Sequence, residues 1–189
     1  MLYRYLYMGF GSPENIKPKE TTSHVFLSAW DGKLFLYYET DQKDALPESV
    51  VSGQPESLPD GTAWIPMPEI FHYSAITNEE EWKRKMPKTP SIRVVYLRPE
   101  MVASYVFYHY QLQEEKRLRG DKYYMIGLLG NFLVSYNETP VELDDGKQKG
   151  SLKTHNTPRD WHGLMELHFA PWKDFDGAWR ETTPVFYRQ

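Results

Sequence analysis

Two long stretches of the chain alternate apolar or aromatic runs with Gly-containing turns. The first, His24–Thr40, reads HVFLSAWDGKLFLYYET, and the second, Tyr123–Thr139, reads YYMIGLLGNFLVSYNET. β-Branched and aromatic residues favour strands, and two such runs joined by a short Gly-containing turn are typical of a β-hairpin. Asp31-Gly32 is a strong two-residue hairpin signal, and Gly130-Asn131 is a weaker one. The pattern therefore predicts two hairpins, each of which ends in Glu-Thr.

Residues outside the hairpins also recur at a nearly constant spacing. The equivalent landmarks lie 97 to 99 residues apart and are Trp64 with Trp161, Trp82 with Trp179, and Glu39 with Glu138. Upstream of the hairpins, Tyr3–Phe10 and Ile92–Arg98 each have the composition of a strand that enters its unit. We therefore expect two copies of one unit, residues 1–90 and residues 91–189.

The second copy holds the strongest helix signal in the chain. Pro99 suits the first turn of a helix, and no Pro or Gly interrupts the stretch Met101–Arg119. Gly120 can end this helix in a left-handed conformation. The corresponding stretch of the first copy, residues 12–23, contains two prolines and has room for a turn or two at most. The first copy is therefore expected to lack the long helix.

Each hairpin is followed by a long polar loop, residues 42–62 and 140–159, and such loops often cover or form binding sites. After each loop we expect a short strand, a brief polar helix ending in Trp82 or Trp179, and a final extended piece. The order strand, helix, strand, strand, helix, strand is ferredoxin-like. The expected fold class is α+β, with two ferredoxin-like repeats whose sheets form a pseudo-dimeric α+β barrel.

Composition and charge narrow the range of functions. A formal net charge of −4 and the lack of a dense Lys/Arg run argue against nucleic-acid binding. The chain has no Cys, which removes disulfides, thiolate metal sites and a Cys nucleophile, and which fits a reducing compartment. No apolar run has the roughly 18–20 residues of a membrane span, and the first residues lack the apolar core of a signal peptide. We therefore expect a cytoplasmic protein with no membrane partner.

Tyr105 and His109 are four residues apart on the predicted helix, so their side chains lie on the same face. A histidine titrates near neutrality and a tyrosine hydroxyl can donate or accept a hydrogen bond, so such a pair facing a pocket suits proton transfer. The same helix carries further tyrosines, and aromatic residues on an amphipathic helix usually pack against a sheet. The spacing alone leaves both interpretations open.

The stretch RVVYLRPEMVASYVFYHYQLQEE, followed by YYMIGLLGNFLVSYNE, resembles the L-rhamnose mutarotase family, small dimeric α+β barrel proteins. The matching positions cover about half of the chain and are Arg98-Pro99, Tyr105, His109, Glu115, Tyr124-Met125-Ile126 and Glu138. The resemblance implies that Tyr105 and His109 form an acid/base pair that interconverts sugar anomers without a cofactor. It also implies that Trp161 is a wall on which a sugar stacks, and that Tyr124 and Glu115 bind the substrate.

His168 is a further candidate for substrate binding. In a strand Leu164–Phe169, the side chains of Glu166 and His168 would point to one face and add to a polar cavity. The chain has no HExxH or comparable spacing of ligands, so we expect no metal site.

The leading expectation is a cofactor-independent acid/base enzyme, with a sugar mutarotase or isomerase activity on a small cyclic substrate. One alternative is a cyclase or monooxygenase-like enzyme that acts on an aromatic or polyketide ligand. Another is a non-catalytic protein that binds a small molecule. The polarity of the cavity walls separates the first two, and a Tyr105–His109 pair packed into the core favours the third. Either a monomer or a homodimer fits all three.

Overall fold

The computed structural model describes residues 1–20, 24–116, 119–146 and 148–189. These residues form an α+β protein with two five-stranded antiparallel sheets, a two-stranded sheet and few helices. The chain divides into two compact units. Unit 1 contains residues 1–67, 76–92 and 182–189, and unit 2 contains residues 68–75 and 93–181.

The sheet of unit 1 has the strand order β12-β3-β4-β1-β6. Its central part is the predicted hairpin, and β1 pairs with β4 along its full length, from Tyr3 opposite Thr40 to Phe10 opposite Lys33. The bounds of the strands are β1 Tyr3–Phe10, β3 His24–Trp30, β4 Lys33–Thr40, β6 Ile65–Pro66 and β12 Thr183–Arg188. The separate two-stranded sheet pairs β2 (Lys17–Pro18) with β5 (Val51–Ser52).

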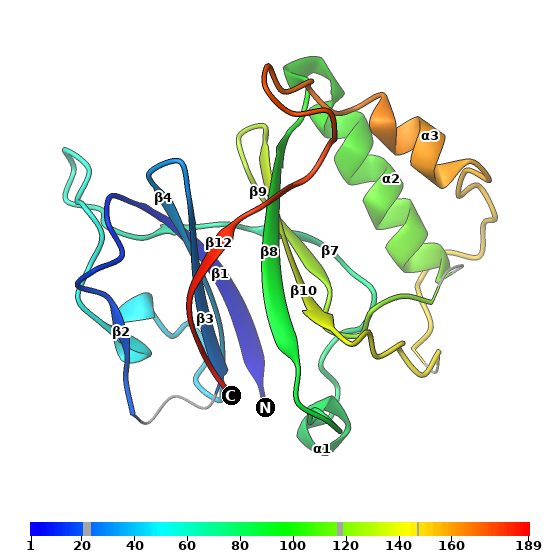
Figure 1. The fold of residues 1–189 in the computed structure, drawn as a ribbon. Helices are drawn as coiled ribbons and strands as arrows, with labels where there is room; N and C mark the ends of the chain where they lie inside the picture. Colours follow the sequence, from blue (N-terminus) through cyan, green and yellow to red (C-terminus); the bar gives the residue numbers. More distant parts are fainter. Residues whose placement is uncertain (21–23, 117–118, 147) are drawn as a thin grey trace. The chain divides into compact units, whose positions relative to one another are not determined.

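The second sheet has the strand order β11-β8-β10-β9-β7. Its strands are β7 Glu69–His72, β8 Thr89–Tyr96, β9 Met125–Leu129, β10 Phe132–Thr139 and β11 Arg180–Glu181. Strand β8 begins in unit 1 and enters unit 2 at Arg93. Figure 1 shows the long helix α2 lying across the strands of this sheet.

The two sheets have the same topology. In each one the hairpin is flanked by the entering strand, β1 or β8, and beyond it lies a two-residue strand, β6 or β11. The fifth strand of each sheet comes from the other half of the sequence, because β7 pairs with β9 and β12 pairs with β3. The compact units therefore differ from the expected division at residues 90 and 91 in three segments, 68–75, 91–92 and 182–189. The division of the sequence into two repeats, residues 1–90 and 91–189, stays a prediction.

Both hairpins have the predicted two-residue turns. In the first, Asp31 (φ 49°) and Gly32 (φ 69°) both have positive φ, as the tight turn between two twisted strands requires. In the second, Gly130 (φ 61°) takes the left-handed conformation between paired Leu129 and Phe132. Each turn fixes the register of its hairpin, so alternate residues of both strands face one core.

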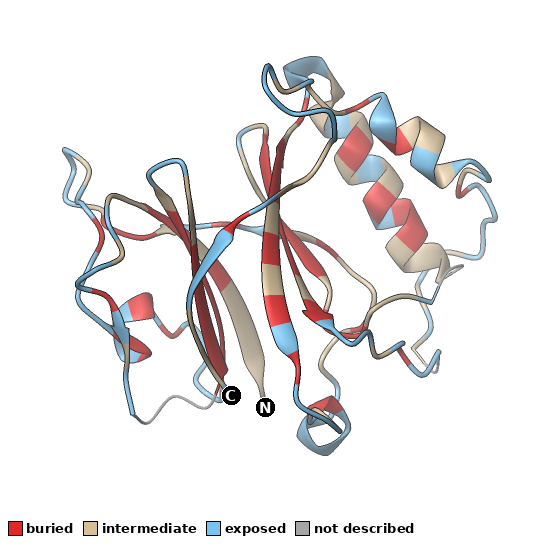
Figure 2. Ribbon diagram, in the orientation of Figure 1, coloured by how far each residue is buried: buried red, intermediate tan, exposed pale blue. Residues whose placement is uncertain are grey.

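Each unit has its own apolar core. In unit 1, Leu27, Leu36 and Trp64 pack with the segment around Val50. In unit 2, helix α2 packs on the sheet through Tyr105 and Leu112, which meet Leu133 and Phe71. Figure 2 shows the buried residues of α2 on the side that faces the strands. The core of unit 2 is thus the layer between helix and sheet.

The helices are shorter than the sequence predicts. A 3₁₀ turn, Pro99–Met101, leads into α2, Val102–Glu115. Helix α2 ends there because Lys116 takes the left-handed conformation (φ 47°) and its N–H bonds to the Leu112 carbonyl. The predicted end at Gly120 was therefore too late by about a turn, and residues 117–118 lie outside the described part. Another 3₁₀ turn covers Pro47–Ser49.

Of the two short helices, one agrees with the expectation and the other does not. Helix α1, Glu79–Trp82, is the brief helix expected to end at Trp82, and the Asn78 side chain caps it. Helix α3, Trp161–Glu166, occupies the first half of the stretch where a strand Leu164–Phe169 was expected, and a turn follows it, so that prediction was wrong. The Asp160 carboxylate accepts the Gly163 N–H at 3.0 Å and starts this helix. The helix expected to end at Trp179 is absent, since the residues before Trp179 form bends.

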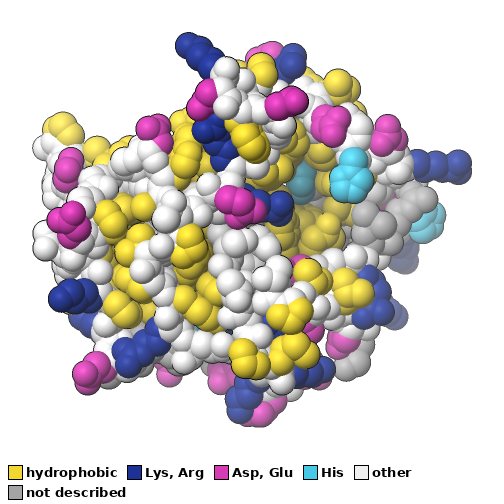
Figure 3. All heavy atoms as spheres, in the orientation of Figure 1, with side chains coloured by type: hydrophobic (Ala, Val, Ile, Leu, Met, Phe, Trp, Pro, Cys, Tyr) yellow, Lys and Arg dark blue, Asp and Glu magenta, His cyan; other side chains and the backbone are white. Residues whose placement is uncertain are grey.

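None of the helices formed by the described residues has the length and apolar character needed to cross a bilayer. On the face shown in Figure 3, acidic and basic side chains are interspersed and neither sign forms a continuous field.

Candidate functional site

Tyr105 and His109 meet as the sequence predicts, on the face of α2 that packs on the sheet. Their ring centroids are 4.0 Å apart, and His109 Nδ1 lies 2.9 Å from the Tyr105 backbone carbonyl. A carbonyl only accepts, so Nδ1 carries the proton of the neutral ring. Tyr105 is 1% exposed and His109 is 4% exposed, so both residues are buried.

Aromatic rings enclose the pair. Phe71 and Trp161 approach the His109 ring edge-on, with centroid distances of 5.0 and 4.9 Å. Phe169 lies 5.9 Å from the Tyr105 ring. Trp161, expected as a wall for a sugar, thus has the histidine as its neighbour.

Burial sets the protonation of both groups. Burial, together with the nearby His168, lowers the pKa of His109 to about 4 against a usual value of 6.5, although the hydrogen bond to the Tyr105 carbonyl opposes this shift. Burial also raises the pKa of Tyr105 well above its usual value. A general acid or base works best when its pKa lies near the working pH. Both residues instead stay neutral across the physiological range.

His168 is fully buried beside the same pair. Its ring lies 5.7 Å from that of Tyr105. Its Nδ1 is 2.9 Å from the Leu164 carbonyl, and its Nε2 is 3.0 Å from the Ser104 hydroxyl. Both ring nitrogens therefore have partners within unit 2. The expectation that Glu166 and His168 share one strand face fails, because Glu166 lies in α3 and is exposed.

Tyr124 and Glu115 are the two remaining predicted site residues. The Tyr124 ring packs 6.1 Å from Phe71 and 5.8 Å from Tyr73, and burial raises its pKa to about 12. Four of the six predicted site residues thus form one cluster, in which Tyr105, His109 and His168 are buried and Trp161 is partly buried. Tyr124 borders this cluster through Phe71, and Glu115 lies at the far end of α2.

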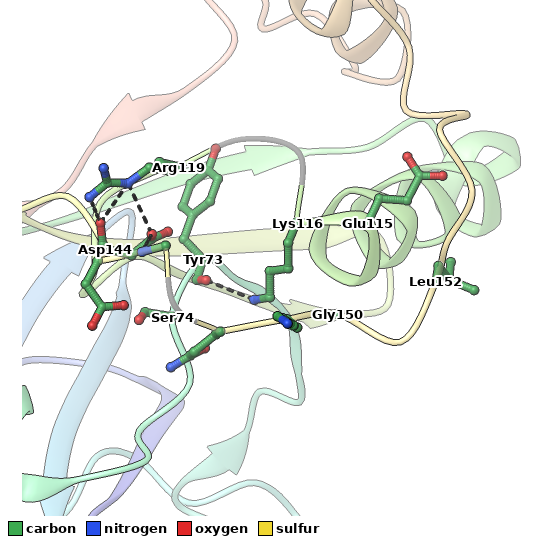
Figure 4. A pocket seen from close by; sticks show the side chains of 12 residues that line it. Tyr73, Ser74, Glu115, Lys116, Arg119, Asp144, Gly150 and Leu152 are labelled. Carbon is green, nitrogen blue, oxygen red and sulfur yellow. Dashed lines mark hydrogen bonds and ion pairs between the residues drawn. The ribbon is translucent and has the colours of Figure 1, made fainter.

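A cavity of about 300 Å³ opens at the C-terminal end of α2. Of the predicted site residues only Glu115 lines it, and Figure 4 shows its carboxylate pointing away from the Lys116 ammonium. The lining comes from three segments of unit 2: the chain after β7, the end of α2, and the loop that follows β10. The lining side chains include Tyr73, Ser74, Lys116, Arg119, Asp144 and Leu152.

Hydrogen bonds hold the three segments together. The Gln148 side-chain amide pairs with the Ala75 backbone on both sides, accepting from its N–H at 2.9 Å and donating to its carbonyl at 2.6 Å. The Glu114 carboxylate accepts the Ser151 N–H at 2.9 Å and the Ser151 hydroxyl at 2.7 Å. Gly150 sits so close to α2 that an added Cβ would lie 1.8 Å from the Glu114 carbonyl oxygen. These contacts join the walls of the cavity to one another.

Glu115 fastens the next part of the same loop. Its carboxylate accepts hydrogen bonds from the Thr154 hydroxyl, the Asn156 N–H, and both the N–H and the hydroxyl of Thr157. Desolvation raises the pKa of Glu115, but these hydrogen bonds outweigh it and lower the pKa to about 2. This carboxylate is occupied in holding the loop.

Unit 1 contains a buried polar cluster that sequence reasoning missed. Glu39 Oε1 accepts from Tyr37 at 2.7 Å and from the Trp82 indole at 3.1 Å, and Arg84 bonds to both carboxylate oxygens. His24 Nε2 lies 3.2 Å from Arg84. In unit 2, Tyr136 donates to Glu138 at 2.7 Å in the same Tyr-x-Glu arrangement. The repeated Glu-Thr at the hairpin ends was the available signal for these clusters.

No family model matches the chain, and no curated protein matches it by sequence. Among solved structures the chain is similar to one described as "Crystal structure study of anthrone oxidase-like protein". The similarity covers 99% of this chain and 92% of that one, at 10% sequence identity and a TM-score of 0.38.

Proposed function

We propose that the protein binds a small polar molecule, without transforming it, in the cavity at the end of α2. The observation that carries the proposal is the separation between this cavity and the Tyr105–His109 pair. The cavity is lined by charged and polar groups, whereas the pair is enclosed by aromatic rings and does not line the cavity. Tyr73 stands between them, since it lines the cavity and packs 4.8 Å from Phe71.

The volume and the lining of the cavity indicate which kind of ligand it can hold. About 300 Å³ is at the lower end of the usual range for ligand pockets. Aromatic ligands are held mainly by apolar walls, but here three acidic and three basic residues contribute to the lining. A small hydrophilic molecule suits these walls better than an aromatic or polyketide ligand. This weakens the cyclase and monooxygenase-like alternative.

The mutarotase hypothesis needs Tyr105 and His109 to exchange protons with a sugar. Its direct test is saturation-transfer NMR of anomer exchange on several aldoses, with His109→Gln as the control variant. We expect no acceleration from the wild-type protein. Acceleration that the substitution abolishes would restore the acid/base pair and overturn the binding proposal.

Binding itself is tested with a panel of small carboxylates, sugars and amines, followed by ligand-observed NMR. Leu152→Trp places a larger side chain at the cavity wall and should abolish binding of any hit. Val185→Trp, at an exposed apolar position of unit 1, is the matched control and should leave binding unchanged. A hit that binds both variants equally well would place the site elsewhere.

We also infer that the chain consists of two ferredoxin-like repeats that together form a pseudo-dimeric α+β barrel, the first repeat lacking the long helix. What supports this is the matching strand order of the two sheets, each completed by a strand from the other half of the sequence. Because each half supplies an edge strand to the other's sheet, residues 1–90 expressed alone should not fold. A cooperative unfolding transition of that fragment would contradict the inference.

A further inference from the structure

Two lysines of the cavity lining form no ion pair with a described residue: Lys149, which is exposed, and Lys116, which is partly shielded from water. Lys116 is half-buried, and its Nζ donates to the Tyr73 backbone carbonyl at 3.1 Å, as Figure 4 shows. Among the described residues no carboxylate lies within ion-pair distance of it. An ammonium carries three donors, and a neutral carbonyl uses one of them. The burial of Lys116, which lowers its pKa, means that water only partly replaces the missing partners.

The acidic groups of the cavity are occupied by other donors. Asp144 Oδ1 accepts the Gly146 N–H at 2.8 Å and lies 3.5 Å from Arg119 Nε. Arg119 also donates to the Asp144 backbone carbonyl. The Glu115 carboxylate is held by the loop 154–157, and Asp145 is engaged as well. The carboxylates of the lining therefore already have hydrogen-bond or ion-pair partners within the protein.

The carbonyl groups at the C-terminal end of α2 are not the partners of the Lys116 ammonium either. A lysine near a helix C-terminus often neutralises the last carbonyls. Here the Leu112 carbonyl accepts the Lys116 N–H at 3.1 Å, and the Glu114 carbonyl accepts the Leu152 N–H at 3.1 Å. The Lys116 side chain turns instead toward the chain after β7, between Tyr73 and Gly150 (Figure 4).

We propose that the cavity takes a small carboxylate with one negative charge, held by the Lys116 ammonium. This deepens the proposed function and rests on it. The charges around Lys116 favour a monoanion over a dianion. The carboxylates of Asp144 and Glu114 already interact electrostatically with the Lys116 ammonium. A second negative charge on the ligand, as in phosphate, would therefore add repulsion from these two carboxylates.

The test uses acetate and lactate as probes, inorganic phosphate as the dianion and acetamide as the neutral isostere of acetate, all at one ionic strength. Binding is measured by ligand-observed NMR on the full chain. Lys116→Met removes the charge and keeps the length, and Lys116→Arg keeps the charge. Lys173→Met, at an exposed lysine outside the cavity, is the matched control.

We expect acetate or lactate to bind at least about tenfold more tightly than acetamide and phosphate, because a charge-assisted hydrogen bond is worth more than a neutral one. Lys116→Met should weaken carboxylate binding about tenfold or more, while Lys116→Arg and Lys173→Met should stay within about threefold of wild type. Equal binding of acetate to wild type and Lys116→Met would overturn the proposal.

The same experiments distinguish two outcomes: the cavity binds a ligand other than a carboxylate, or the cavity binds no ligand at all. If acetamide or a sugar binds, and Leu152→Trp abolishes that binding, the cavity is a binding site and only the carboxylate assignment is wrong. If none of the probes and none of the wider panel binds, both are wrong. A melting temperature of Lys116→Met equal to that of wild type excludes loss of folding as the cause of weaker binding.

Discussion

His109 should make the protein acid-sensitive in a way that a catalytic, solvent-facing histidine would not. Its folded pKa is about 4 against 6.5 for an unperturbed histidine. The unfolded chain therefore takes up a proton below about pH 6.5 that the folded chain refuses until about pH 4. The stabilisation from the neutral buried ring is complete above about pH 6.5 and is lost as the pH falls toward 4.

The size of this effect follows from the two pKa values. Lowering the pH from about 7.5 to about 4.5 should reduce the free energy of unfolding by about 2.5 kcal/mol through His109 alone. The assay is urea unfolding at both pH values for wild type and His109→Gln. Other titrating groups act on both proteins, so the difference between their two pH dependences isolates His109. His162→Gln, at an exposed histidine of the same unit, is the control and should behave like wild type.

Parallel pH dependences of wild type and His109→Gln would refute the reasoning. They would mean that His109 can be protonated in the folded protein near pH 6, and hence that its ring reaches water. Such a result would return the Tyr105–His109 pair to consideration as an acid/base site.

Three further predictions concern the buried Glu39 cluster of unit 1 and the loop that packs against the end of α2. Arg84→Met should reduce the free energy of unfolding by about 3–5 kcal/mol, because it leaves the buried Glu39 carboxylate without its bidentate partner; a loss below about 1 kcal/mol in urea unfolding would contradict this. Glu115→Gln should increase hydrogen exchange at the Thr157 amide at neutral pH. In wild type the same protection should persist below pH 4.5 and fall as the pH approaches about 2, and protection lost already at pH 5 would count against the Glu115 clasp. Gly150→Ala should destabilise the protein by at least about 1 kcal/mol, since its Cβ would collide with a backbone carbonyl of α2; an unchanged thermal midpoint would show that the loop can move away.

The hairpins and the start of α2 could be predicted because local signals determine them. Asp31-Gly32 and Gly130 suit the turn conformations that tight hairpins need, and Pro99 suits a first helical turn. The same-face placement of Tyr105 and His109 followed from helical periodicity alone. Periodicity does not tell a face that packs from a face that opens onto a pocket. The pair was therefore found, but its burial could not be read from the sequence.

Other features depend on tertiary contacts that the sequence pattern does not contain. The end of α2 at Lys116, a left-handed non-Gly residue, required knowledge of the loop that packs against it. The pairing of β7 with β9 and of β12 with β3 joins segments from different halves of the chain. The loop 140–159 was identified as a possible binding segment, but the side chains that line the cavity, Lys116 and Arg119 among them, carried no motif.

The most direct test of the central claim is a map of amide chemical-shift changes when acetate or lactate is titrated into the ¹⁵N-labelled protein. The account predicts the largest changes at Ser74, Lys116 and Gly146, around the cavity, with little change at Tyr105 and His109. Changes centred on Tyr105 and His109, with none at the cavity, would contradict it.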